Sequence, residues 1–79
     1  MTQGERQRKA ICHYIARFRD EQGYAPSIRE ITSEIHAKST SHVALHLVWL
    51  ELHGYINRDA RIARSIRLTE AGQQLARGA

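Results

Sequence analysis

Arginines are concentrated in one short segment of this 79-residue chain. Residues 58–67 carry four positive charges against one carboxylate, Asp59, and so hold +3 of the formal net charge of +4. The four residues are Arg58, Arg61, Arg64 and Arg67. Guanidinium groups bind phosphates through paired N–H donors, and a focused cluster attracts a polyanion better than scattered charge does. The segment therefore favours contact with nucleic acid over the alternative, a loop of solvated arginines.

A second group of candidate binding residues precedes the arginines. Ser39, Thr40 and Ser41 are three consecutive side chains that can cap a helix, and His42 follows them. At the start of a helix, side-chain donors and free backbone amides both face an anion. We therefore expect contacts to phosphates and bases at residues 39–42.

Two histidines on the same predicted helix raise the question of a metal site. His42 and His46 are four residues apart and could chelate, but structural zinc needs four ligands, and neither Cys12 nor a nearby carboxylate completes the set. We expect His46 to be packed and hydrogen-bonded and His42 to face DNA or solvent. No metal and no cofactor is predicted.

The other candidates for catalysis are equally sparse. Cys12 is the only cysteine and falls near an apolar stripe, which favours a buried structural thiol. A single cysteine cannot form an internal disulfide and indicates a cytoplasmic protein. No glycine-rich phosphate loop and no paired carboxylates are present, so we predict no enzymatic activity.

Length and composition predict one small domain. The chain is 42% hydrophobic and 25% charged, and no linker or repeat marks a boundary within residues 1–79. A chain of this size buries only about 60% of the surface it exposes when unfolded, which excludes two independent cores. The longest apolar run, residues 43–47, is far short of the roughly 20 residues that a membrane span needs. We expect no signal peptide and no membrane contact.

Two capping boxes predict where the first helices begin. Thr2 with Glu5 starts a helix that Gly23 ends, and Ser27 with Glu30 starts a second, shorter helix. Apolar residues recur at helical spacing in both, namely Ile11, Tyr14, Ile15 and Phe18 in the first and Ile28, Ile31 and Ile35 in the second. A third helix follows Ser39–Ser41 and continues to Gly54.

The remaining residues alternate in the way strands do. Residues 55–58 and 65–68 predict a two-stranded hairpin whose basic tip is residues 59–64. Thr69 can cap a last short helix to about Arg77, with Ala71 and Leu75 inward. The predicted fold is mainly α with a small β-hairpin: a winged helix-turn-helix with three helices, a two-stranded wing and a short C-terminal helix. Such a third helix fits the major groove, while the wing reaches the adjacent backbone or minor groove.

The sequence resembles the DNA-binding domain of LexA-type repressors. The residues that carry the resemblance are Gly23 to Ile31 (GYAPSIREI), Ser39 to Val43, His46, Leu47, Leu50, Gly54 to Asp59 and Ile66 to Leu68. The similar part is residues 2–68, which leaves 69–79 as the C-terminal helix. Residues 68–72, which join the wing to the last helix, are similar instead to the wing-to-helix junction of other winged-helix regulators. The resemblance does not extend to the family's self-cleaving peptidase half, so we expect no self-cleavage.

The resemblance implies that the third helix recognises the operator and that the arginine-bearing loop is the wing. Operator contacts are implied for the positions of Ser39, Ser41, His42, Ala44 and Leu45. The full predicted DNA-binding set also includes residues at the start of the second predicted helix and in the turn before residue 39: it is Ser27, Arg29, Lys38, Ser39, Thr40, Ser41, His42, Ala44, Leu45, Arg58, Arg61 and Arg64.

The third helix departs from the family in having apolar residues on two sides. At 100° per residue, Val43, Leu47 and Leu50 form the core stripe, and Leu45, Val48, Trp49 and Leu52 lie opposite. Such a second stripe has to be covered. The last helix, a second copy of the chain or another protein could cover it. The predicted protein interface is Leu45, Val48, Trp49, Leu52 and Leu75.

Two functions follow from these features. The first is a sequence-specific transcription regulator that binds duplex DNA as a homodimer and represses by occupying its operator. The alternative is a winged-helix module that binds a protein partner, as an inhibitor or adaptor, through Leu45, Trp49 and Leu52.

Overall fold

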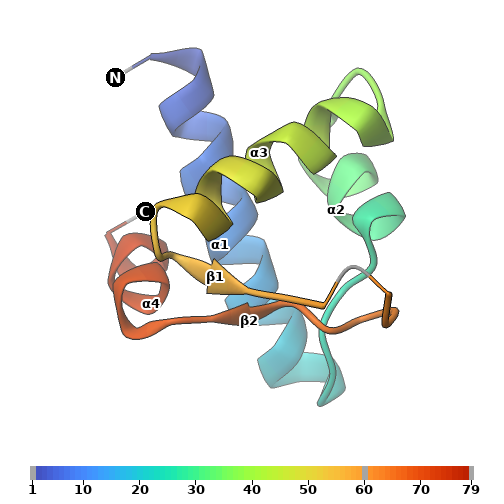
Figure 1. Ribbon diagram of the computed structural model, residues 1–79, viewed down its shortest axis with the longest axis vertical. Coiled ribbons are helices and arrows are strands. Elements are labelled where there is room, and N and C mark those ends of the chain that lie inside the picture. Colours follow the sequence, from blue (N-terminus) through green and yellow to red (C-terminus); the bar gives the residue numbers. More distant parts are fainter. Residues whose placement is uncertain (1, 60, 79) are drawn as a thin grey trace.

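The computed structural model describes residues 2–59 and 61–78 and contains four helices and a short antiparallel hairpin. Ala60 in the predicted wing loop and the residues at the two chain ends lie outside the described part. The elements are α1 (Gln3–Gln22), α2 (Ile28–Glu34), α3 (Thr40–Leu52), β1 (Ile56–Asn57), β2 (Arg67–Leu68) and α4 (Glu70–Arg77). The hairpin packs against α1, α3 and α4 (Figure 1). The predicted winged helix-turn-helix is therefore confirmed.

Local signals set the helix ends where they were predicted. Both capping boxes form: Thr2 accepts from the Glu5 amide at 3.1 Å, and Ser27 accepts from the Glu30 amide at 3.1 Å. Gly23 ends α1 with φ 82°, a left-handed backbone that glycine adopts without strain. These interactions join residues at most four apart, so they form as soon as the helix does.

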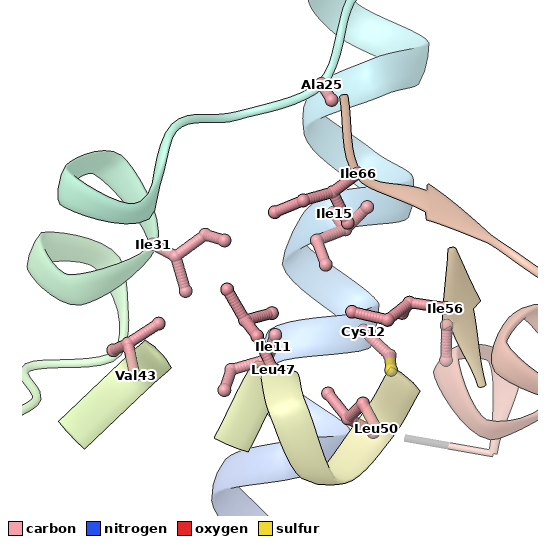
Figure 2. Close-up of a cluster of buried hydrophobic side chains, with 11 residues drawn as sticks. Ile11, Cys12, Ile15, Ala25, Ile31, Val43, Leu47, Leu50, Ile56 and Ile66 are labelled. Atoms are coloured by element: carbon pink, nitrogen blue, oxygen red, sulfur yellow. The ribbon is translucent and has the colours of Figure 1, made fainter. Parts of the chain in front are cut away.

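The core lies where α1, α2, α3 and the hairpin meet (Figure 2). The predicted stripe of α3, Val43, Leu47 and Leu50, is completely buried, as are Ile11 and Ile15 of α1. Two further residues of the predicted α1 stripe, Tyr14 and Phe18, are half-buried and pack edge to face. Helical periodicity therefore identified the centre of the core correctly.

The hairpin runs across α1, and its tip lies beside the segment that joins α1 to α2 (Figure 1). Ile56 pairs with Leu68 and Asn57 with Arg67. Alternation along β1 buries Ile56 and exposes Asn57. The pairing thus directs one face of the wing to the core and leaves the other to solvent.

Helix α4 packs on α1 and β2, away from the outer face of α3. Ala76 and Gly72 are its buried residues, and Leu75 packs at the edge of the core. The expectation that Ala71 points inward was wrong, since it is exposed. The interpretation that α4 covers the outer face of α3 was also wrong, because α4 buries its small residues against the longer α1 instead. Among the described residues, no helix is both long enough and apolar enough to cross a membrane.

Candidate nucleic-acid interface

The N-terminus of α3 is open to solvent. Ser39 is the cap, and its Oγ accepts from the His42 amide at 3.2 Å. Ser39, Thr40 and Ser41 are all exposed, and the first turn contains no acidic residue. Free amides and hydroxyls with no carboxylate beside them form a good environment for a phosphate.

His42 and His46 are turned towards α1. The Nε2 atoms of both rings lie 3.0 Å from Oε1 of Gln7, which only accepts, so each ring donates. The rings also contact each other edge to face, with centroids 4.8 Å apart. His46 is buried, as predicted, whereas His42 is half-buried against α1 and does not simply face DNA or solvent. Gln7 thus couples the start of α3 to α1.

No group of three or more His, Cys, Asp or Glu side chains in residues 2–59 and 61–78 has the arrangement of a metal site. Cys12 is buried in the core, and burial raises the pKa of its thiol to about 11. A thiol with this pKa stays protonated at neutral pH and is a poor nucleophile. The prediction that Cys12 is a buried structural residue is confirmed.

We expect the protein to lose stability as the pH falls below about 6.5, the ordinary pKa of histidine. Burial, followed by the nearby His42 and Arg8, lowers the pKa of His46. The unfolded chain therefore takes up this proton at a higher pH than the folded protein, so protons favour unfolding until the pH falls below the pKa of His46 in the folded protein. Urea denaturation on either side of pH 6.5 measures the difference.

His46→Asn should remove most of this pH dependence. The control is His36→Asn, because His36 is exposed and asparagine tolerates its left-handed backbone at φ 54°. Equal pH dependence in the wild type and His46→Asn would show that His46 is not the group responsible.

The wing arginines differ in their freedom to bind a ligand. Arg61 has a side chain that is 91% exposed, although its Nε lies 3.3 Å from Asp59. Arg58 is only 14% exposed and binds Glu51 of α3 at 3.4 Å. The Arg61 side chain is thus accessible to a phosphate, whereas Arg58 would have to exchange its carboxylate for a phosphate.

Arg64 fastens the wing to the start of α2. One of its terminal nitrogens donates to Oε1 of Glu30 at 2.8 Å and to the Ala25 carbonyl at 3.1 Å, and the guanidinium stacks on Tyr24. Glu30 also closes the capping box by accepting from the Ser27 amide, and these bonds, the backbone one first, lower the pKa of its carboxyl. Arg64 therefore links the wing loop to the start of α2 through the Glu30 carboxylate and the Ala25 carbonyl.

The other predicted contacts lie around α2 and the turn. Arg29 and Lys38 are exposed, whereas the Ser27 hydroxyl is half-buried and already serves the α2 cap. Ala44 is half-buried and Leu45 is 71% exposed. Arg29, Lys38 and Leu45 are therefore open to a ligand without rearrangement.

The outer face of α3 is apolar and uncovered by any described residue. Leu45 is 71%, Val48 44% and Leu52 78% exposed. Trp49 was wrongly placed on this face. The Arg8 guanidinium covers its ring at 4.0 Å, and it stacks on His53 and Tyr55. Leu75 is also absent from the face, since it packs at the core on α4.

Three of the residues that organise the interface were not predicted as such. Gln7 binds His42 and His46, Arg8 covers Trp49, and Glu51 binds Arg58. Each of these partners lies on another element or beyond the end of the same helix, so no local pattern indicates the pair. Glu30, which binds Arg64, had a local signal in its capping box, but that signal did not indicate Arg64 as a partner.

A two-helix turn with an open α3 N-terminus and a basic wing fastened beside it defines the winged helix-turn-helix class of DNA-binding domains. Comparison with known families makes this more specific. Residues 2–65 match the LexA DNA binding domain, and the chain belongs to that family.

Curated relatives carry the name LexA repressor. The protein from Herpetosiphon aurantiacus is 46% identical over 65 residues, which are 82% of this chain and 30% of the relative. The protein from Ligilactobacillus salivarius is 39% identical over 75 residues, 95% of this chain and 36% of the relative. The chain therefore spans about a third of the length of these curated relatives.

Proposed function

We propose that this protein is a sequence-specific repressor that binds duplex DNA and acts by occupying its operator as a homodimer. The observation that carries the proposal is the open, acid-free N-terminus of α3 in a chain of the LexA DNA-binding family. Relatives named LexA repressor support repression as the biological role.

The wing supplies the electrostatic part of binding. Arg61 is exposed, and the Arg64–Glu30 pair holds the loop against the helix-turn-helix. Contacts to phosphates position such a protein on the duplex, and contacts to base edges specify the sequence. Arg61, Arg29 and Lys38 then bind the phosphates of the DNA backbone, and the first turns of α3 enter the major groove, where they contact base edges.

A homodimer would match a two-fold operator. Helix-turn-helix dimers bind half-sites one helical turn apart, so the symmetry of the protein appears in the DNA. Selection from a random duplex library tests this directly. A palindrome with half-sites about 10 base pairs apart supports the dimer, and a single half-site would contradict it.

The salt dependence of binding is expected to show about four cationic contacts per monomer, those of Arg29, Lys38 and Arg61 and one from Arg58 after it exchanges Glu51 for a phosphate. The slope of log affinity against log salt should then be close to −4, and Arg61→Ala should make it about one unit shallower. Because a phosphate contact carries no sequence information, the variant should weaken binding to all duplexes alike.

The matched control is Arg77→Ala on α4, which removes the same charge from an exposed position away from α3. It should leave the slope close to that of the wild type. A flat salt dependence of the wild type would contradict the proposed function itself.

The exposure of Leu45, Val48 and Leu52 favours one alternative, a module that binds a protein partner as an inhibitor or adaptor. That function predicts tight binding to a protein with little affinity for any duplex. The structure weakens this alternative in one respect, because the tryptophan expected to anchor such an interface is stacked under Arg8.

A further inference from the structure

Helix α3 lacks the side chains that usually recognise bases through paired hydrogen bonds. Its 13 residues contain no Arg, Lys, Asn, Gln or Asp, and the single Glu51 is bound to Arg58. Arginine and lysine recognise guanine, asparagine and glutamine recognise adenine, and carboxylates recognise cytosine. Helix α3 therefore cannot recognise guanine, adenine or cytosine through paired hydrogen bonds.

The two histidines of α3 do not replace the missing groups. Both rings are held through Nε2 by Gln7 of α1 and are at least half-buried. What remains on the outer side are the hydroxyls of Thr40 and Ser41 and the exposed apolar side chains of Leu45 and Val48.

These groups form one stripe that begins at the proposed DNA-entering end. Ser41, Leu45 and Val48 follow one another at four- and three-residue spacing, so they lie on one side of the helix. Leu45 is one turn from the open N-terminus and is 71% exposed. When the N-terminus of α3 enters the major groove, an apolar side chain one turn along the helix lies against the base edges. The apolar group that a base pair presents there is the thymine methyl.

We propose, given the DNA-binding function above, that Leu45 recognises thymine methyl groups in the major groove and that Val48 extends this contact. The preferred half-site is then specified by the positions of thymines, together with hydrogen bonds from Ser41. Thymine methyls are the occupant of the N-terminal part of the exposed face of α3, at Leu45 and Val48.

The size and position of this face favour DNA over a second copy of the chain. Three side chains expose on the order of a few hundred Å², and even two such faces together stay below the roughly 1,200 Å² that a stable interface buries. The stripe is also continuous with the acid-free N-terminus of α3, which attracts a polyanion.

The test uses the half-site recovered from random duplex DNA, with its thymines replaced one at a time by deoxyuridine, which lacks the methyl. For the wild type, each thymine that Leu45 contacts should lose about three- to five-fold in affinity on replacement. At the thymines that Leu45 contacts, Leu45→Ala should bind the thymine and uracil duplexes equally. The control Leu52→Ala, two turns further along α3, should remain as sensitive as the wild type.

The outcomes separate this inference from the function on which it rests. If the wild type binds no duplex even at low salt, the proposed function fails. If it binds with the expected salt dependence but no uracil replacement weakens binding, the function stands and thymine recognition is overturned. If Leu45→Ala changes the oligomeric state and leaves uracil sensitivity unchanged, a second copy covers the face and the inference is again overturned. Circular dichroism of each variant verifies folding.

Discussion

Ser41→Asp is expected to weaken duplex binding by about 100-fold or more without destabilising the protein. Ser41 is exposed in the first turn of α3, where the proposed interface meets phosphates and base edges. A carboxylate there faces the polyanion, and like charges brought together across an interface cost several kcal/mol. The same carboxylate interacts favourably with the N-terminal end of the helix dipole, which stabilises the fold by about 0.3–1 kcal/mol.

The opposite signs of the two effects make the experiment specific. Fluorescence anisotropy with the selected duplex measures binding, and thermal unfolding followed by circular dichroism measures stability. Ala71→Asp is the matched control, because Ala71 is exposed at the equivalent second position of α4 and changes the net charge equally. If both variants weakened binding to the same extent, net charge alone would account for it, and α3 would not be the element on the DNA.

Interactions between residues close together in the sequence were predicted correctly, whereas interactions between distant residues were not. Capping boxes and the Gly23 cap join residues within a helical turn, and both helix starts were predicted to the residue. The core stripe of α3 was also predicted, because a 3.6-residue period determines which side chains share a face. In each case the interaction depends on the element itself and hardly on what surrounds it.

Contacts between elements could not be predicted in the same way. Trp49 lies 120° from Val43 around α3, at the border between the two faces. Its burial is decided by Arg8, a residue of α1 whose approach no spacing within α3 reveals. The same holds for Arg64 and Glu30, 34 residues apart. From the sequence, a polar side chain can be expected to form a hydrogen bond or ion pair, but the sequence does not identify the residue that it pairs with.

The position of α4 shows how such a contact changes a functional interpretation. The apolar stripe on the outer side of α3 required a cover, and α4 was one candidate. Because α4 packs its buried Ala76 and Gly72 against α1 and the wing junction, Leu45 and Leu52 stay exposed. The face that could have been ordinary core is therefore available for the duplex.

Gly72→Ala is expected to destabilise the protein by about 3 kcal/mol, although alanine is the better helix former by about 1 kcal/mol. Gly72 is buried where α4 crosses the hairpin, and a Cβ there would fall inside contact distance of the Tyr55 carbonyl oxygen and 3.2 Å from Cδ2 of Leu68. That carbonyl accepts from the Thr69 amide at 3.0 Å, so the backbone cannot move aside without losing the bond that positions α4. In a domain of this size the midpoint of thermal unfolding should fall by more than 10 °C, at about 4–8 °C per kcal/mol.

Gly78→Ala is the matched control at the other end of α4. The backbone of Gly78 has φ −72°, and an added Cβ would make only ordinary contacts, the nearest at 3.6 Å from the Gln74 carbonyl oxygen. Its stability should stay within about 0.5 kcal/mol of the wild type. If Gly72→Ala instead melted at or above the wild-type temperature, α4 would not dock against the Tyr55 carbonyl. The helix would then be free to cover the outer face of α3, and the assignment of Leu45 to the DNA groove would lose the observation on which it depends.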